Sequence, residues 1–177
     1  MSIPSEIRKQ VRQRANFACE FCGVSETDVG GQLTIDHFQP KSKGGDDFLE
    51  NLLYCCIRCN QYKQDYWFTG TDDLSLWNPR QEAASIHFLE LDDGKLLPRT
   101  PTGEFTIKRL RLNRSPLVTY RLSKRRQAEE IRLLKQYKDL SQLLGQLNEQ
   151  LVMLVEEQQQ LLEEQRELIR FLLRRNQ

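Results

Sequence analysis

The chain has 177 residues, of which 38% are hydrophobic, and a formal net charge of +1, with a mean hydropathy of −0.63. These values argue against one large core that fills the whole length, and they favour one compact domain joined to an extended element. No apolar run reaches the roughly 18 to 20 residues of a membrane helix, and the N-terminus lacks the apolar stretch of a signal peptide, so we expect a cytoplasmic protein.

Short mixed elements are predicted in the first third of the chain. A basic helix is expected over residues 5–15, with Ser5 as its N-cap. Residues 33–38 alternate with β-branched side chains and predict a strand. A loop that contains Pro40 and two glycines follows, and then come a short strand at 52–56 and a helix from Arg58 to about Trp67. The predicted fold class is α+β.

Three turn signals divide the next segment, residues 68–115. They lie at residues 77–80, 92–95 and 101–103, where Pro, Gly, Asn or Asp gather. Short apolar runs such as residues 86–91 separate them. We therefore expect the hairpins of a small β-containing extension.

From about Leu117 the chain is predicted to be helical, because no proline follows Pro116 and Gly145 is the only glycine there. Leucine recurs every seven residues, at Leu133, Leu140, Leu147, Leu154, Leu161 and Leu168. This spacing predicts a coiled coil that joins at least two copies of the chain, and further apolar residues beside it leave a higher oligomer open. The alternative is one amphipathic helix folded back, with Gly145 as the hinge. The predicted divisions are 1–67, 68–116 and 117–177.

The charges of the chain are unevenly distributed. Between residues 105 and 128 there are eight Lys or Arg and no Asp or Glu. Such a basic strip indicates contact with a polyanion such as nucleic acid, and the alternative is a solubilising surface. The strip consists of Lys108, Arg109, Arg111, Arg114, Arg121, Lys124, Arg125 and Arg126.

All five cysteines lie in the first third of the chain. Four of them form two pairs with a two-residue spacer, Cys19 with Cys22 and Cys56 with Cys59. In an intracellular protein this spacing indicates a metal site more than a disulfide framework. Four thiolates make a closed tetrahedral site, which suits structural zinc. Cys55 is then a small buried residue, and the alternative is that all five are buried without metal.

A second group of residues points to catalysis. Asp36 and His37 end the first predicted strand, and Asn51 and Asn60 follow within the next segments. A lone histidine on a strand is usually structural, but here an acid precedes it and a loop with Pro and Gly follows it. The other histidine, His87, is expected to be structural.

The sequence from Asp36 to Lys63 resembles the signature of the HNH nuclease family nearly end to end, and residues 14–23 resemble the lead-in of its four-cysteine branch. The likeness is specific over residues 7–66 and does not cover the tail. It departs from the His-Asn-His pattern of the family name at Asn60, which stands where the last histidine of that pattern is expected. The resemblance implies a ββα-metal core, in which two strands and a helix surround one divalent cation, Mg²⁺ or Mn²⁺.

The resemblance also implies a role for each matching residue. His37 is expected to be the general base that deprotonates the attacking water, because neutral histidine is available near its reference pKa of about 6.5. Asp36 and Asn60 are expected to hold the catalytic cation, which stabilises the leaving oxygen of a phosphodiester. Asn51 is expected to pin the loop that orients His37.

We therefore expect an endonuclease that acts on DNA, with RNA as an alternative substrate. Lys41, Lys43 and Lys63 are expected to neutralise substrate phosphates, or else to be ordinary solvated lysines. Two other classes of protein stay open: a zinc-ribbon module that binds nucleic acid without cutting it, and an oligomeric scaffold with an inert head. The first of these needs no general base, so the presence of His37 beside Asp36 argues against it.

Overall fold

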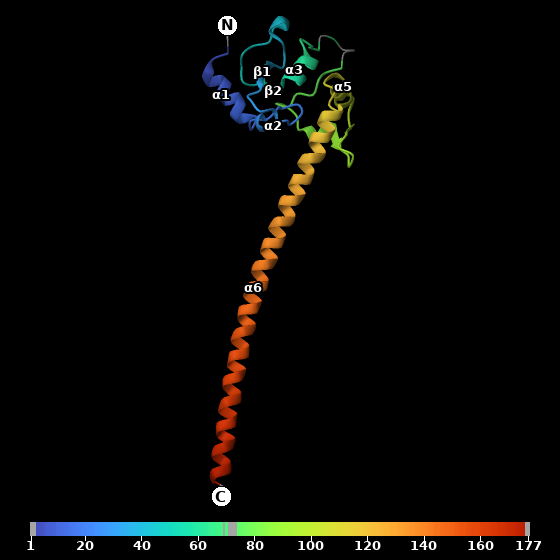
Figure 1. Cartoon of the computed structure of the whole chain (residues 1–177). Coiled ribbons are helices and arrows are strands. Elements are labelled where there is room, and N and C mark those ends of the chain that lie inside the picture. Colours follow the sequence, from blue (N-terminus) through green and yellow to red (C-terminus); the bar gives the residue numbers. More distant parts are fainter. Residues whose placement is uncertain (1–2, 69, 71–73, 176–177) are drawn as a thin grey trace. The chain divides into compact units, whose positions relative to one another are not determined.

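A computed structural model describes residues 3–68, 70 and 74–175, and it divides the chain into two compact units, Met1–Lys124 and Arg125–Gln177. The first unit combines short helices with two antiparallel hairpins, and the helix α6 (Ser115–Arg175) begins in it and continues through the second unit (Figure 1). The predicted α+β class is confirmed. None of the described helices combines the length and the apolar character that a bilayer span requires.

The N-terminal half of the first unit contains a strand–strand–helix core. Its elements are α1 (Ser5–Arg14), α2 (Glu26–Val29), β1 (Thr34–His37), β2 (Leu52–Cys55) and α3 (Ile57–Lys63). Strands β1 and β2 are antiparallel, and His37 lies opposite Leu52. Strand β2 is buried on both faces because Leu52 and Tyr54 pack with Val11 of α1, whereas Leu53 packs into the main core.

Two predicted helix ends are corrected by the structure. Pro4, not Ser5, occupies the N-cap of α1, and Ser5 is already helical, so its side chain does not cap the helix. Helix α3 ends at Lys63 and does not reach Trp67. The backbone of Gln64 turns into the left-handed region, with a φ of 56°, and this interrupts the helix.

The second part of the first unit contains α4 (Ala84–His87), β3 (Phe88–Glu90), β4 (Leu96–Pro98) and α5 (Pro101–Arg109). The predicted hairpin is present as β3 and β4. The apolar run at 86–91 is a strand only from Phe88, because α4 occupies its first residues. Residues 101–103 do not form the predicted turn but begin α5, with Thr100 as N-cap and Pro101 in the first helical turn.

The two parts of the first unit share one hydrophobic core. Trp77 packs edge-on against Phe21, with ring centroids 6.3 Å apart, and against Phe88, at 5.2 Å. Leu110 and Leu112, which follow α5, are fully buried in the same cluster. The residues after 68 therefore complete the core that supports the cysteines and β2.

In the second unit the described residues form the remainder of α6, and the side chains of residues 125–174 are exposed. The six leucines of the seven-residue repeat are between 51% and 60% exposed. The helix passes through Gly145 without interruption, so the predicted alternative of a reversal at this glycine is not the form seen here. A stripe of large apolar side chains is thus left in solvent in the single chain.

Candidate metal centre and active site

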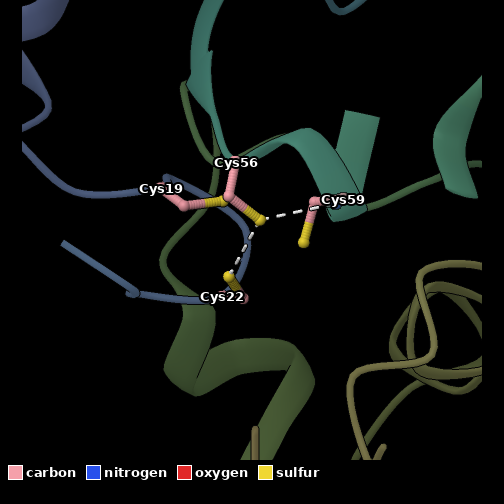
Figure 2. A group of neighbouring side chains, drawn as sticks. All are labelled: Cys19, Cys22, Cys56 and Cys59. Atoms are coloured by element: carbon pink, nitrogen blue, oxygen red, sulfur yellow. Dashed lines mark hydrogen bonds between the residues drawn. The ribbon is translucent and has the colours of Figure 1, made fainter. Parts of the chain in front are cut away.

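The two cysteine pairs meet in a cluster beside the N-terminus of α3. Cys19 and Cys22 come from the loop after α1, Cys56 is the N-cap of α3 and Cys59 lies in its first turn. Their side chains point toward one another (Figure 2), and all four sulfur atoms lie within 4.8 Å of each other. The Cys59 backbone N–H donates to Cys56 Sγ at 3.4 Å, the kind of contact that a two-residue spacer allows.

The spacing of the sulfur atoms fits a tetrahedral metal. Sulfurs about 2.3 Å from a central zinc ion would lie roughly 3.8 Å from one another, and Cys22 Sγ lies 3.7 Å from Cys56 Sγ. Neighbouring thiols donate to Cys19 and hold its pKa well below the usual range. Cys22 and Cys59 donate hydrogen bonds to Cys19, which raises the pKa of both thiols because they must stay protonated to donate, so ionising one sulfur conflicts with ionising the others. A cation would remove this conflict, so the donor set fits zinc.

Cys55 stays outside the cluster, as expected. It is fully buried, and its Sγ contacts the Cys56 carbonyl oxygen at 3.5 Å. Closeness to Cys19 and burial raise the pKa of its thiol. Cys55 is therefore a neutral core residue.

The end of β1 carries the second group of predicted residues. Asp36 and His37 are the last two residues of β1, and the His37 backbone N–H donates to Asp36 Oδ1 at 2.9 Å. The other carboxylate oxygen, Oδ2, is buried and accepts no hydrogen bond from the described residues. One oxygen of Asp36 is thus held by the strand, and the other is paired with the Lys63 ammonium 3.1 Å away, so a cation bound here would share it with that charge.

Asn51 bridges the loop after β1 by three hydrogen bonds. Its Oδ1 accepts from the Gln39 backbone N–H at 2.8 Å, and its Nδ2 donates to the carbonyl oxygens of Gln39, at 3.1 Å, and Asp46, at 2.9 Å. Gly45 lets the loop close, because a Cβ at this position would lie 1.8 Å from the Gln39 carbonyl oxygen. These contacts fix the loop directly beside His37.

Lys63 differs from its predicted role. The side chain is fully buried, and its Nζ donates to the His37 carbonyl oxygen at 2.6 Å and lies 3.1 Å from Asp36 Oδ2. A lysine in this position does not reach a substrate phosphate. It fastens α3 to the end of β1 and places a positive charge beside the Asp36 carboxylate.

Asn60 lies three residues before Lys63 and therefore on the face of α3 that turns toward β1. The Asn60 carboxamide makes no hydrogen bond within the described part of the chain. Together with Asp36 Oδ2, whose neighbour is the Lys63 ammonium at 3.1 Å, this gives two oxygen atoms without a hydrogen bond from the described residues. Oxygen donors suit a hard divalent cation, so these residues fit Mg²⁺ or Mn²⁺.

Asp47 is a residue of this site that the sequence did not single out. Its Oδ1 lies 2.7 Å from His37 Nε2, and its Oδ2 accepts from Lys41 Nζ at 2.6 Å. Lys41 belongs to η1 (Lys41–Lys43), the short helical turn of the pinned loop. Lys41 is thus engaged with a carboxylate, whereas Lys43 makes no ion pair with any described residue.

The basic strip includes several arginines that contact the protein itself. Three of its arginines bind parts of the first unit: Arg109 donates to the Lys63 carbonyl oxygen at 3.1 Å, and Arg121 is buried and donates to the Gly94 carbonyl oxygen at 2.7 Å. Arg114 Nη2 lies 3.9 Å from Cys59 Sγ, where its charge favours a thiolate. These arginines support the fold and the cysteine cluster.

The other members of the strip are closer to solvent. Arg111 stacks over the Tyr62 ring at 4.8 Å. Lys108 pairs with Glu104 at 2.6 Å, and Lys124 pairs with Asp28 at 2.9 Å. Arg125 and Arg126 are exposed at the start of the second unit. The strip therefore retains a few exposed cations.

His87 has contacts that support a structural role. Its Nδ1 lies 2.6 Å from Thr100 Oγ1, and its Nε2 lies 2.8 Å from Glu82 Oε2. The imidazole is buried, and its contact with Thr100 joins α4 to the N-cap of α5.

The comparisons with known proteins agree with this geometry. Residues 19–67, which span the cysteine cluster, β1, β2 and α3, match the family model described as HNH endonuclease. No curated protein and no solved structure matches the chain. The match covers the segment that holds Asp36, His37, Asn51 and Asn60.

Proposed function

We propose that this chain, which carries an HNH endonuclease domain at residues 19–67, is a divalent-metal-dependent endonuclease that hydrolyses the phosphodiester bonds of DNA. An HNH domain implies a nucleic-acid substrate. The observation that carries the proposal is the end of β1, where Asp36 Oδ2 is buried without a hydrogen bond from the described residues, 3.1 Å from the Lys63 ammonium, and His37 follows directly. A binding module without catalysis would need neither group.

The residues of the site divide the reaction between them. His37 accepts the proton of the attacking water, because neutral imidazole is the base available at neutral pH. Asp36 and Asn60 would hold a Mg²⁺ or Mn²⁺ ion, which supplies stabilisation of the charge that develops on the phosphate and on the leaving oxygen. Asn51 keeps the loop in place so that His37 does not reorient between turnovers.

The cysteine cluster has a structural part in this proposal. Cys19, Cys22, Cys56 and Cys59 would hold one zinc ion with no open coordination position, so this metal does not take part in hydrolysis. Because Cys56 and Cys59 belong to α3, zinc binding orients the helix that carries Asn60. The two metals would therefore have separate roles.

Substrate contact is proposed for the cations that remain exposed. Lys43 is exposed in η1, on the loop beside His37, and forms no ion pair with a described residue, and Lys41 lies on the same turn. Arg126 and Lys108 are exposed members of the basic strip, and Lys108 would have to leave Glu104 to bind a phosphate. DNA is the proposed substrate, and RNA is the alternative because it has the same phosphodiester group.

The tail, residues 125–175, is proposed to associate with the tail of a second copy. Its heptad leucines are exposed in the single chain, and burying apolar area of this kind is the main driving force of helix association. The apolar residues Val155, Leu162 and Ile169 widen the stripe beyond a strict dimer seam. The association is therefore at least dimeric.

The direct test is incubation of a supercoiled plasmid with purified full-length protein. We expect nicking or linearisation with Mg²⁺ or Mn²⁺ and none in excess EDTA, and a parallel single-stranded RNA substrate identifies the preferred nucleic acid. Binding without cleavage under any of these metals would favour the zinc-ribbon module. The absence of both binding and cleavage would favour the scaffold.

A further inference from the structure

The contact between His37 and Asp47 gives the imidazole of His37 a fixed partner. Asp47 Oδ1 lies 2.7 Å from His37 Nε2, and Asp47 Oδ2 accepts from Lys41 at 2.6 Å. We propose that Asp47 is a positioning residue, which holds His37 as the Nε2–H tautomer and leaves Nδ1 as the nitrogen that accepts a proton. This inference rests on the proposed role of His37 as the general base.

The tautomer follows from the chemistry of the two groups. An ionised carboxylate can only accept hydrogen bonds, so the ring nitrogen that faces it must carry the hydrogen. In neutral imidazole the other nitrogen is then an acceptor. His37 Nδ1 has no hydrogen-bond partner among residues 3–68, 70 and 74–175, which leaves its lone pair available. The charged neighbour Lys41, with His37, lowers the pKa of Asp47 and so keeps the carboxylate ionised.

The loop holds Asp47 in position. Asn51 Nδ2 donates to the carbonyl oxygen of Asp46, the residue directly before Asp47, at 2.9 Å. Lys41 fixes the second carboxylate oxygen from the opposite end of the loop. The carboxylate is therefore restrained by the backbone before it and by a cation, and not only by the histidine that it orients.

A plain surface ion pair is the competing explanation. The Asp47 side chain is 36% exposed and that of Lys41 is 46% exposed, and pairs of this kind contribute little to stability. The neighbouring Asp46 provides the matched comparison. It has the same charge on the same loop, but its Oδ1 accepts from the Phe48 backbone N–H at 3.2 Å and does not contact His37.

The experiment compares wild type, Asp47→Asn and Asp46→Asn in two measurements. The first is long-range ¹H–¹⁵N NMR of the histidine rings in full-length protein with zinc but no Mg²⁺. The pH is set about 1.5 units above the reference pKa of histidine, so that the neutral ring predominates. The chain has two histidines, so His37→Ala assigns both rings. The second is plasmid cleavage at several DNA concentrations, which separates kcat from KM.

We expect His37 to be the Nε2–H tautomer in wild type and in Asp46→Asn. Asp47→Asn should lose this preference, because a carboxamide both donates and accepts. Asp47→Asn should lower kcat at least about tenfold, which is part of the 10²- to 10⁴-fold that a general base contributes. It should change KM by less than about twofold. Asp46→Asn should leave both values unchanged.

Two results would overturn the inference. One is a wild-type His37 that is mainly the Nδ1–H tautomer, and the other is an Asp47→Asn protein with the wild-type tautomer and kcat. The NMR result does not depend on cleavage. A wild type that holds the Nε2–H tautomer but cuts no nucleic acid would therefore overturn the proposed function, and with it a catalytic purpose for Asp47, while the contact itself would stand.

Discussion

The buried ammonium of Lys63 lies 3.1 Å from Asp36 Oδ2 and joins the last turn of α3 to the end of β1. Removing one member of a buried ion pair leaves the other charge uncompensated, which is strongly destabilising. We expect Lys63→Met to lower the free energy of unfolding by about 3 kcal/mol, measured by urea denaturation.

Lys41→Met is the matched control for this prediction, because Lys41 also pairs with an aspartate but is exposed. Its cost should stay below about 1 kcal/mol. The double variant Asp36→Asn/Lys63→Met should recover part of the lost stability, because no charge is then left unpaired. Equal stability of Lys63→Met and wild type would show that the lysine does not hold the strand end.

The zinc content of the protein should be about one per chain, and it should depend on the four clustered cysteines. Cys59→Ser should lose zinc and melt at a lower temperature, because binding of a structural metal contributes directly to folding. Elemental analysis and thermal melting measure the two effects. Cys55→Ala is the control, since Cys55 is adjacent and buried but lies outside the cluster. Zinc retained by Cys59→Ser would contradict a four-cysteine site.

The ion pair between Arg12 and Glu26 should make stability depend on pH. Both nitrogens Nε and Nη2 of Arg12 donate to the Glu26 carboxylate at 2.6 Å, and these hydrogen bonds lower the pKa of Glu26. A lowered carboxylate pKa gives stability that is present above the unfolded value, about 4.3 for Glu. It is lost as the pH falls through the lower, folded value.

Glu26→Gln tests this dependence. Its deficit in unfolding free energy relative to wild type should be constant near pH 7 and should shrink as the pH falls below about 4.3. Zinc release in acid affects both proteins and cancels in the difference. Glu6→Gln, at an exposed position of α1, should show no such trend. A deficit that grows in acid would reverse the assigned sign.

Self-association of the tail should depend on its heptad leucines. Leu147→Glu places a charge in the predicted seam, and it should raise the dissociation constant at least about a hundredfold, the effect of losing one buried leucine. Gln142→Glu adds the same charge on the opposite face of the helix and should leave association unchanged. Light scattering of the full-length proteins decides between these outcomes. A monomeric wild type at micromolar concentration would contradict the tail proposal.

The features predicted best from the sequence are those that depend on the spacing of residues close together in the chain. Two matched cysteine pairs and one strand that ends in Asp36-His37 indicated the cluster and β1 because each depends on neighbouring residues. Helix α5 could also have been predicted, since Thr100, Pro101 and Glu104 stand at the N-cap, first and fourth helical positions. The turn signal at Gly103 concealed this start.

Contacts across loops could not be predicted in the same way. Asp47 reaches His37 only because Asn51 closes the loop between them, and Lys63 is buried because α3 ends there and packs on β1. The charges of the basic strip are neighbours in sequence, but they lie on two helices and the loop between them, and several of them bind oxygen atoms of the first unit. Such relationships depend on tertiary packing, which composition and periodicity do not contain.

The catalytic role of His37 is tested most directly by plasmid cleavage with wild type and His37→Ala, prepared with equal zinc content and assayed with Mg²⁺. We expect the variant to cut at least about 10²-fold more slowly, the smallest effect usual for a general base. Its zinc content and melting temperature should match those of wild type, because His37 is part of neither the core nor the cysteine cluster. A His37→Ala protein that nicks plasmid at the wild-type rate would contradict the assignment of this residue as the base and of the β1 end as the active site.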